Sequence, residues 1–239
     1  ANTTGRNNVA IAYTSMAANT EGTGNTAVGL SSLDVNTTGD NNVALGAGAL
    51  GANTTADDNT AVGYTALVAN TTGTRNTAIG SFALDANTTG DKNTGLGYGS
   101  LSTNTTGTLN VAIGNEPLLS NTTGNNNVAM GHQALKSNST ASNNTAIGHE
   151  ALEANTTGTA NVAVGALSLD ANTEGDYNVA MGYYALGAAT TADKNVAVGS
   201  GAGQLITTGS YNVAIGADAL DATTTGATNT AVGAEALSA

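Results

Sequence analysis

The stretch Asn59-Thr60-Ala61-Val62-Gly63 decides the fold, because its pattern returns every 17 residues along the chain. Fourteen copies follow one another without an insertion or a deletion. Strict periodicity of this kind is typical of a solenoid, in which each repeat forms one coil and buries its inner side only when a neighbouring coil stacks on it. The sequence therefore predicts an all-β protein, a parallel β-solenoid or β-roll with one 17-residue coil per repeat and about 14 coils.

The repeat runs through residues 1–239, so we expect a single solenoid array and no second domain. Ala1 and Ala239 occupy the same place in the repeat, which means that the array starts and ends in the middle of a coil. Neither end carries the polar, atypical repeat that caps a finished solenoid. We therefore expect a segment of a longer array, or a subunit whose ends are covered by another chain.

Composition limits both the core and the partners. The chain has 32 Gly, one Phe, no Trp and no Cys, and only 9% of its residues are charged, so any core is thin and repeated along an axis. A net charge of −12 with five basic residues argues against binding to nucleic acid or to anionic membranes. The absence of Cys excludes a disulfide framework and a thiolate zinc site, and no apolar run is long enough to insert into a membrane.

We number the 17 positions of each repeat from its first Asn, so that Asn59 is position 1 and Gly63 is position 5. Positions 1 to 5 predict a strand, in which alternate residues point to the same face. Val or Thr at position 2 and Val, Ile, Leu or Met at position 4 share one face, while Asn at position 1 and Ala at position 3 share the other. A second strand is predicted over positions 7 to 11, with Leu67 and its equivalents at position 9.

Two arrangements of the interior follow from this alternation. We expect the aliphatic residue at position 4 and the Leu at position 9 to form the core with help from position 2, which leaves the Ala and Gly face for another chain. In the alternative, Asn at position 1 and Ala at position 3 line the interior, and the column of Val and Thr at position 2 becomes the interface. Both arrangements predict a homo-oligomer.

Stacking places each residue above its equivalent, so a recurring polar position becomes a ladder. Side-chain amides of Asn can hydrogen-bond from coil to coil in such a stack, and this satisfies them when they are buried. The predicted structural ladder at position 1 consists of Asn8, Asn25, Asn42, Asn59, Asn76, Asn93, Asn110, Asn127, Asn144, Asn161, Asn178, Asn195, Asn212 and Asn229.

The pattern Asn-Val-Ala-Ile-Gly at residues 110–114 and 212–216, followed by a small residue such as Ala219, resembles the head repeats of trimeric autotransporter adhesins. Arrays of this kind are also similar to shaft segments of phage tail fibres and of bacterial surface proteins. The resemblance covers the whole chain, and it implies a left-handed parallel β-roll in which three chains pack side by side. Those heads have a shorter repeat, without the Ala-Asn-Thr-Thr-Gly arm.

A single catalytic or metal-binding site requires residues that differ from the repeat consensus. His132 and His149 occupy position 6 of consecutive coils, beside a column of Glu116, Gln133 and Glu150 at position 7. Two imidazoles in such a place could bind a metal weakly. Position 6 elsewhere holds Tyr, Ser, Ala, Asn or Leu, as a corner facing solvent would. We therefore expect no metal site and retain His132 and His149 as weak candidates.

Other sites are not expected. The sequence has no phosphate-binding loop and no nucleophile motif, so we expect neither an enzyme nor a bound cofactor. The nonapeptide motif of calcium-binding β-rolls is absent, which makes the acidic residues at position 16 solvated turn residues. These residues include Asp40, Asp57, Asp91, Asp176 and Asp193.

Two further sets of residues are candidates for contacts or modification. Aromatic side chains fall at predicted corners of the coil, where they are either partner contacts or ordinary surface residues: Tyr13, Tyr64, Tyr98, Tyr183, Phe82, Tyr184, Tyr177 and Tyr211. Nine copies of the glycosylation sequon are candidate glycosylation sites or plain turns, at Asn2, Asn36, Asn53, Asn70, Asn87, Asn104, Asn121, Asn138 and Asn155.

These features predict an extracellular structural fibre, or an adhesin shaft or head, at a cell surface or in a virion. It would assemble with copies of itself as a trimer or filament and present or form a binding surface for a host protein or glycan. We expect no nucleic-acid partner and no membrane insertion. The alternative is an ice-binding β-solenoid that uses ladders of Thr and Asn, although adjacent Thr residues at positions 13 and 14 would point to opposite faces of a strand.

Overall fold

The computed structural model describes residues 2–238. Its internal contacts divide the chain into an N-terminal unit, Ala1–Thr123, and a C-terminal unit, Gly124–Ala239. Both are built from parallel strands, one in each coil. Within residues 2–238 there is no helix, and hence none that could cross a membrane.

Each strand is three residues long and covers positions 2 to 4 of its repeat. The N-terminal unit contains β1 (Val9–Ile11), β2 (Thr26–Val28), β3 (Val43–Leu45), β4 (Thr60–Val62), β5 (Thr77–Ile79), β6 (Thr94–Leu96) and β7 (Val111–Ile113). The C-terminal unit contains β8 (Val128–Met130), β9 (Thr145–Ile147), β10 (Val162–Val164), β11 (Val179–Met181), β12 (Val196–Val198), β13 (Val213–Ile215) and β14 (Thr230–Val232).

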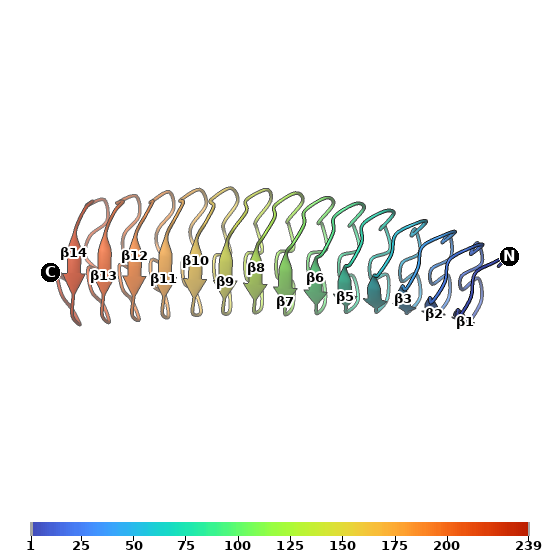
Figure 1. Ribbon diagram of the computed structural model, residues 1–239. Helices are drawn as coiled ribbons and strands as arrows, with labels where there is room; N and C mark the ends of the chain where they lie inside the picture. Colours follow the sequence, from blue (N-terminus) through green and yellow to red (C-terminus); the bar gives the residue numbers. More distant parts are fainter. Residues whose placement is uncertain (1, 239) are drawn as a thin grey trace. The chain divides into compact units, whose positions relative to one another are not determined.

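Within each unit, every strand pairs in parallel with the strand of the next coil (Figure 1). The register places equivalent positions opposite one another, as in Ala61 beside Ala78 and Val62 beside Ile79. The prediction of an all-β parallel solenoid with one 17-residue coil per repeat is confirmed.

The interior is lined by the face of the strand that carries Asn and Ala. Asn59 and Ala61 are fully buried, as is Leu67 from the far side of the coil. Position 4 points outward instead: Ile79 is 38% exposed and Met181 is 43% exposed. The expectation that positions 4 and 2 form the core is therefore wrong, and the alternative with Asn and Ala inside is correct. The remaining part of the expected core, the Leu at position 9, is buried as predicted.

The size and bonding of the interior explain this outcome. The side chains that fill it are mostly Ala at position 3, Ala or Ser at position 8, Leu at position 9 and Asn at positions 1 and 12. Ala is small enough for the two sides of the coil to approach closely, which leaves no room for a second aliphatic residue. Buried Asn is tolerated there because the neighbouring coils satisfy its amide, as the hydrogen bonds described below show.

The second strand predicted over positions 7 to 11 is wrong, because this segment is a series of turns in the structure. Thr65 and Leu67 have φ angles of 52° and 51°, in the left-handed region, and the equivalent residues of other coils behave alike. This conformation turns the peptide groups along the stacking direction. The amide of Thr65 donates to the carbonyl of Ala47 in the preceding coil, and that of Leu67 donates to the carbonyl of Ala83 in the following coil, both at 3.0 Å.

The corner after each strand depends on glycine. Gly63 has a φ angle of 139°, and a Cβ added there would lie 2.5 Å from the carbonyl oxygen of Gly80 in the next coil. A larger residue would therefore be strained in its backbone and would also separate the coils. This explains why position 5 is Gly in nearly every repeat.

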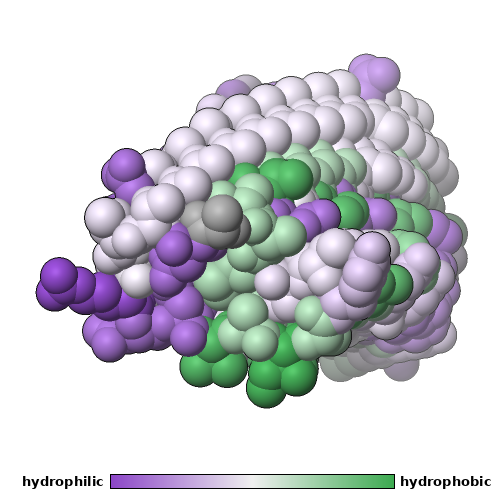
Figure 2. All heavy atoms as spheres, turned by 90° about the vertical axis from the view of Figure 1, so that its right-hand side faces the viewer, coloured by the Kyte–Doolittle hydropathy of each residue, from purple (hydrophilic) through white to green (hydrophobic). Residues whose placement is uncertain are grey.

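Repetition is visible on the surface as well. In the N-terminal unit, Figure 2 shows rows of alike-coloured residues that run away from the viewer, because equivalent positions lie one behind the other. Hydrophobic residues gather on part of this surface and polar residues on other parts. The strand side and the turn side of the coil thus each keep one chemical character along the unit, whereas the corner at positions 6 and 7 varies.

The inside and outside of the strand can be tested with Ala61→Asp and Val62→Asp. Ala61 is fully buried, so a carboxylate there would be desolvated without a partner, and we expect a loss of roughly 3 kcal/mol or more in the free energy of unfolding. Val62 points outward, and its replacement should cost no more than about 1 kcal/mol. Denaturant unfolding and limited proteolysis mapped to residues near β4 measure both. Greater damage from Val62→Asp would mean that the interior is assigned to the wrong face.

Candidate functional site

The most extended surface feature is the outward side of the strands, which we call the outer sheet face and define as positions 2 and 4 of every repeat. Its position-4 side chains are aliphatic or Met throughout, and its position-2 side chains are Val or Thr. No charged residue occurs at either position. The exposed hydrophobic side chains of this face are Val9, Ile11, Leu45, Ile79, Leu96, Met130, Ile147, Met181, Val198, Ile215 and Val232.

The position-1 asparagines lie inside, where they link neighbouring coils. The side-chain oxygen of Asn25 accepts a hydrogen bond from the backbone amide of Asn42 at 2.8 Å. The Nδ2 of Asn42 donates to the carbonyl of Ala56 at 2.8 Å. The same arrangement recurs along each unit, for example from Asn161 to Asn178. These residues therefore have a structural role.

A second ladder, at position 12, was not expected from the sequence. The Nδ2 of Asn53 donates to the side-chain oxygen of Asn36 at 3.0 Å and to the carbonyl of Ala56 at 3.1 Å. Ala56 thus accepts from Asn42 of the first ladder as well as from Asn53 of the second. The repetition of Asn at position 12 was the available signal, but it coincides with the sequon and was interpreted as a turn.

Burial of this second ladder bears on glycosylation. With the exception of Asn2, the asparagines of the sequons are fully buried, and the nitrogen that would carry a glycan donates hydrogen bonds inside the coil. This argues against modification of the folded chain at Asn36, Asn53, Asn70, Asn87, Asn104, Asn121, Asn138 and Asn155. Asn2, the remaining candidate, is exposed.

The polar residues of the turn also bond from coil to coil. The hydroxyl of Thr37, at position 13, donates to the carbonyl of Thr54 at 3.1 Å. At position 16 the carboxylate of Asp40 accepts from the backbone amide of Thr23 at 2.7 Å, and Asp91 accepts in the same way from Thr74. These acidic groups thus stabilise the turn of the preceding coil.

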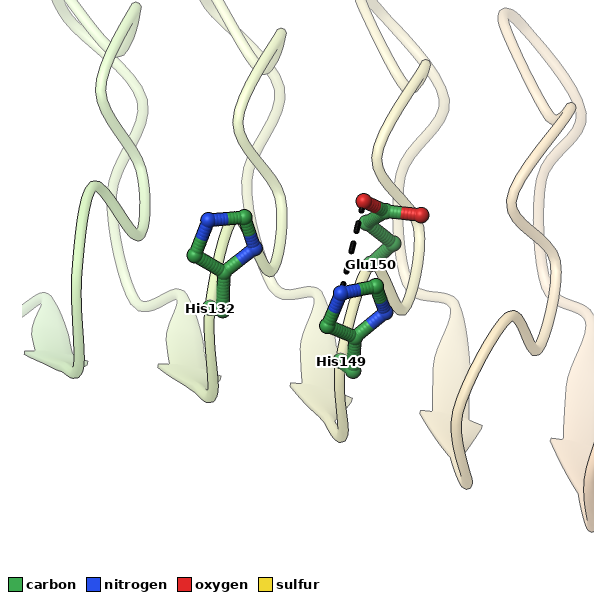
Figure 3. A group of neighbouring side chains, drawn as sticks. All are labelled: His132, His149 and Glu150. Carbon is green, nitrogen blue, oxygen red and sulfur yellow. Dashed lines mark ion pairs between the residues drawn. The ribbon is translucent and has the colours of Figure 1, made fainter.

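The two histidines lie together in the C-terminal unit (Figure 3). Their rings are stacked, with centroids 5.2 Å apart and planes inclined by 12°. The Nε2 of His149 lies 3.5 Å from Oε1 of Glu150. One potential ligand atom from each of the three residues falls within 4.8 Å of the others. The structure therefore brings the weak candidates His132 and His149 together with a carboxylate.

Aromatic residues occur at the corners. Tyr64 and Phe82 meet edge to face with centroids 5.5 Å apart, and Phe82 meets Tyr98 in the same way at 5.8 Å. Tyr13, Tyr64, Tyr98, Tyr177, Tyr183 and Tyr211 are exposed, whereas Phe82 and Tyr184 are partly buried. Tyr183 and Tyr184 lie with ring centroids 6.0 Å apart, and the hydroxyl of Tyr211 accepts a hydrogen bond from Nζ of Lys194 at 2.9 Å.

A hollow of about 250 Å³ occurs where one coil of the C-terminal unit departs from the repeat. That coil has Gly201 at position 7, Gly203 in place of the usual Leu and Ile206 in place of the usual Asn. There is no room for a Cβ at Gly201, because Oδ1 of Asp218 lies where it would be. It is lined by Tyr183, Tyr184, Ser200, Gly201, Gln204 and Asp218.

Comparison of the chain with protein-family models, with curated proteins and with solved structures finds no match in any of the three. The resemblance to adhesin heads and fibre shafts therefore remains an inference from the repeat pattern. The structure itself supports the fold, a parallel β-solenoid with a 17-residue repeat.

One carboxyl group in the C-terminal unit has a shifted pKa. Burial raises the pKa of Asp170 above its ordinary value, and the neighbouring carboxylates of Glu153 and Glu150 raise it further, while hydrogen bonds from the backbone amides of Asp170 and Ala171 oppose the rise. The charged form of Asp170 is thus disfavoured by folding.

This shift predicts a pH-dependent effect of Asp170→Asn. Because the folded pKa is raised, the contribution of Asp170 to stability is fully present below its unfolded pKa of about 3.9 and is lost as the pH rises through the folded pKa. The free energy of unfolding of the variant, relative to the native chain, should therefore increase from acid to neutral pH. Urea unfolding at several pH values measures this difference, and a difference that falls with pH would contradict the assignment.

Proposed function

We propose that the chain is a structural repeat segment of an extracellular fibre or adhesin, which assembles side by side with copies of itself through the outer sheet face. The observation that supports this proposal is a column of aliphatic or Met side chains at position 4 that no polar residue interrupts and in which every side chain is half-buried or exposed, with Leu45, Ile79 and Leu96 among the exposed ones in the N-terminal unit. Monomeric soluble proteins rarely leave contiguous apolar surface of this kind uncovered.

The area supports association. Seven strands, each three residues long, lie in each unit. At about 4.8 Å between strands they give roughly 300 Å² of flat face per unit. Each unit that takes part in an interface adds a face of this size, and a standard interface takes ~800 Å² from each partner.

The pattern of the face favours a copy of the chain as the partner. Its side chains recur at the spacing of strands, about 4.8 Å, and the columns of the same face in a second chain have the same spacing, so two such faces can interdigitate strand by strand. Charge supports the same choice. Chains with a net charge of −12 repel one another, and an uncharged face is where two of them can meet at the least electrostatic cost.

The ice-binding alternative has less support. The hydroxyls of Thr37 and Thr71, at position 13, donate their protons to carbonyls of the following coil and so cannot donate them to ordered water. Thr at position 14 is exposed, but this column is interrupted by Glu21 and Glu174. The outward columns of positions 2 and 4 are dominated by aliphatic side chains. A laterally associating fibre accounts for these features together.

Self-association can be tested with the double variant Leu45→Lys with Ile79→Lys. Both side chains are exposed on alternate strands of the outer sheet face, so the lysines do not face each other directly and the interior is untouched. Sedimentation velocity over a concentration series should show oligomers of the native chain. We expect at least about a ten-fold loss of association in the variant, because each charge would have to be desolvated in the interface.

The matched control is Thr55→Lys with Thr89→Lys, which adds the same charge to the same coils at the exposed position 14. It should associate like the native chain. Circular dichroism should give the same β signal for all three proteins. A native chain that is monomeric at every concentration, or a control that dissociates as fully as the Leu45 and Ile79 variant, would reject the proposal.

A further inference from the structure

We propose that His132, His149 and Glu150 form a binding site for a divalent transition-metal ion, with Zn²⁺ as the best-fitting ion. The site goes beyond the proposed structural role and does not depend on it. Its starting observation is that these three potential ligand atoms lie within 4.8 Å of one another in the C-terminal unit (Figure 3).

The repeat brings the two histidines together. They are the chain's only histidines, and they are 17 residues apart, so stacking places them at the same corner of consecutive coils. Their rings are stacked at 5.2 Å, which is close to the spacing of the coils themselves. Two imidazoles on adjacent coils of a stack held by hydrogen bonds are pre-positioned, and binding an ion does not have to order the backbone.

The carboxylate is fixed beside them by the backbone. Glu150 has a φ angle of 54°, and its amide donates to the carbonyl of His132 at 2.9 Å. This bond ties the residue that supplies the carboxylate to the residue that supplies the first imidazole. Glu150 then reaches the second imidazole as well, with Oε1 3.5 Å from Nε2 of His149.

The distances suit a shared ion. Zinc binds imidazole nitrogen and carboxylate oxygen at about 2.0–2.2 Å, so two ligand atoms on one tetrahedral ion are roughly 3.4 Å apart. The pair formed by His149 and Glu150 already has this separation, at 3.5 Å. His132 has to approach by a further short distance, and its exposed side chain can do so by turning about its own bonds.

The chemistry of the ligands selects the class of ion. Imidazole suits Zn²⁺, Cu²⁺ and Ni²⁺, whereas Ca²⁺ and Mg²⁺ require oxygen ligands. Two imidazoles with one carboxylate form a common zinc ligand set, which leaves a fourth position for water.

The test is calorimetric titration of the untagged, chelator-treated chain with ZnCl₂. We expect one saturable site per chain, little competition from CaCl₂ and a loss of zinc affinity of at least about ten-fold in His149→Gln, which removes a ligand. Zinc should also raise the melting temperature of the native chain, because binding to the folded state alone stabilises it. The melting temperature of His149→Gln should not respond.

Glu150→Gln and Glu174→Gln distinguish ligation from attraction by the acidic surface. Both remove one negative charge from the C-terminal unit, but Glu174 is an exposed residue at position 14 of another coil. Glu150→Gln should weaken zinc binding and Glu174→Gln should leave it unchanged. Absence of a saturable site, equal effects of the two variants, or equal competition by Ca²⁺ would overturn the proposal.

Discussion

Hydrogen bonds between asparagine side chains of neighbouring coils are the constraint on which the rest of the structure depends. A buried amide without a partner costs roughly 2–7 kcal/mol, so a coil with two buried asparagines is not stable by itself. Asn42 and Asn53 show the solution, since each is bonded to the equivalent residue of the preceding coil and both donate to the carbonyl of Ala56. Position 1 accordingly keeps its Asn in all fourteen repeats, whereas position 12 holds Ala189, Ile206 and Thr223 in the last repeats, so the first ladder is the one on which every coil depends.

This requirement explains why the repeat tolerates no insertion. A shift of one residue would move Asn59 out of the interior and would bring Thr60 into it, and the bonds to both neighbouring coils would be lost. It also explains the small residues inside. Ala61 lets the strand approach the rest of the coil closely enough for the ladders on both sides to form. The aliphatic residues at position 4 then have no interior left to occupy, and they remain outside as an apolar face.

The fold itself could be predicted from the period, because strict repetition with a strand pattern and a glycine corner has few structural solutions. The inside of the strand could not be predicted from hydrophobicity. The rule that apolar residues are buried favoured Val62 over Asn59, and it fails here because stacking supplies hydrogen bonds that a single coil does not have. The turn conformation was missed for a related reason. Leucine rarely has a positive φ angle, yet Leu67 has one, because this conformation lets its backbone amide donate a hydrogen bond to the next coil.

Of the candidate site, the pairing of His132 and His149 followed from the repeat, since both occupy the same position of consecutive coils. The distance of Glu150 from His149 could not be predicted in this way, because it depends on a left-handed backbone conformation at Glu150 that the sequence does not indicate. The hollow beside Gly201 was recognisable only as a departure from the consensus at Gly203 and Ile206. A departure from the consensus shows where the repeated surface changes. The shape of the surface at that place depends on the side chains of the neighbouring coils.

The most direct test of the central claim is hydrogen exchange of the asparagine side-chain amides, followed by NMR. Exposed side-chain amides exchange quickly, whereas buried and bonded ones exchange only when the structure opens. The account predicts that the Nδ2 protons of Asn59 and Asn70, at positions 1 and 12, are protected as strongly as the backbone amides of β4. Exchange of these protons at the rate of the exposed Asn2, in a folded chain, would contradict it.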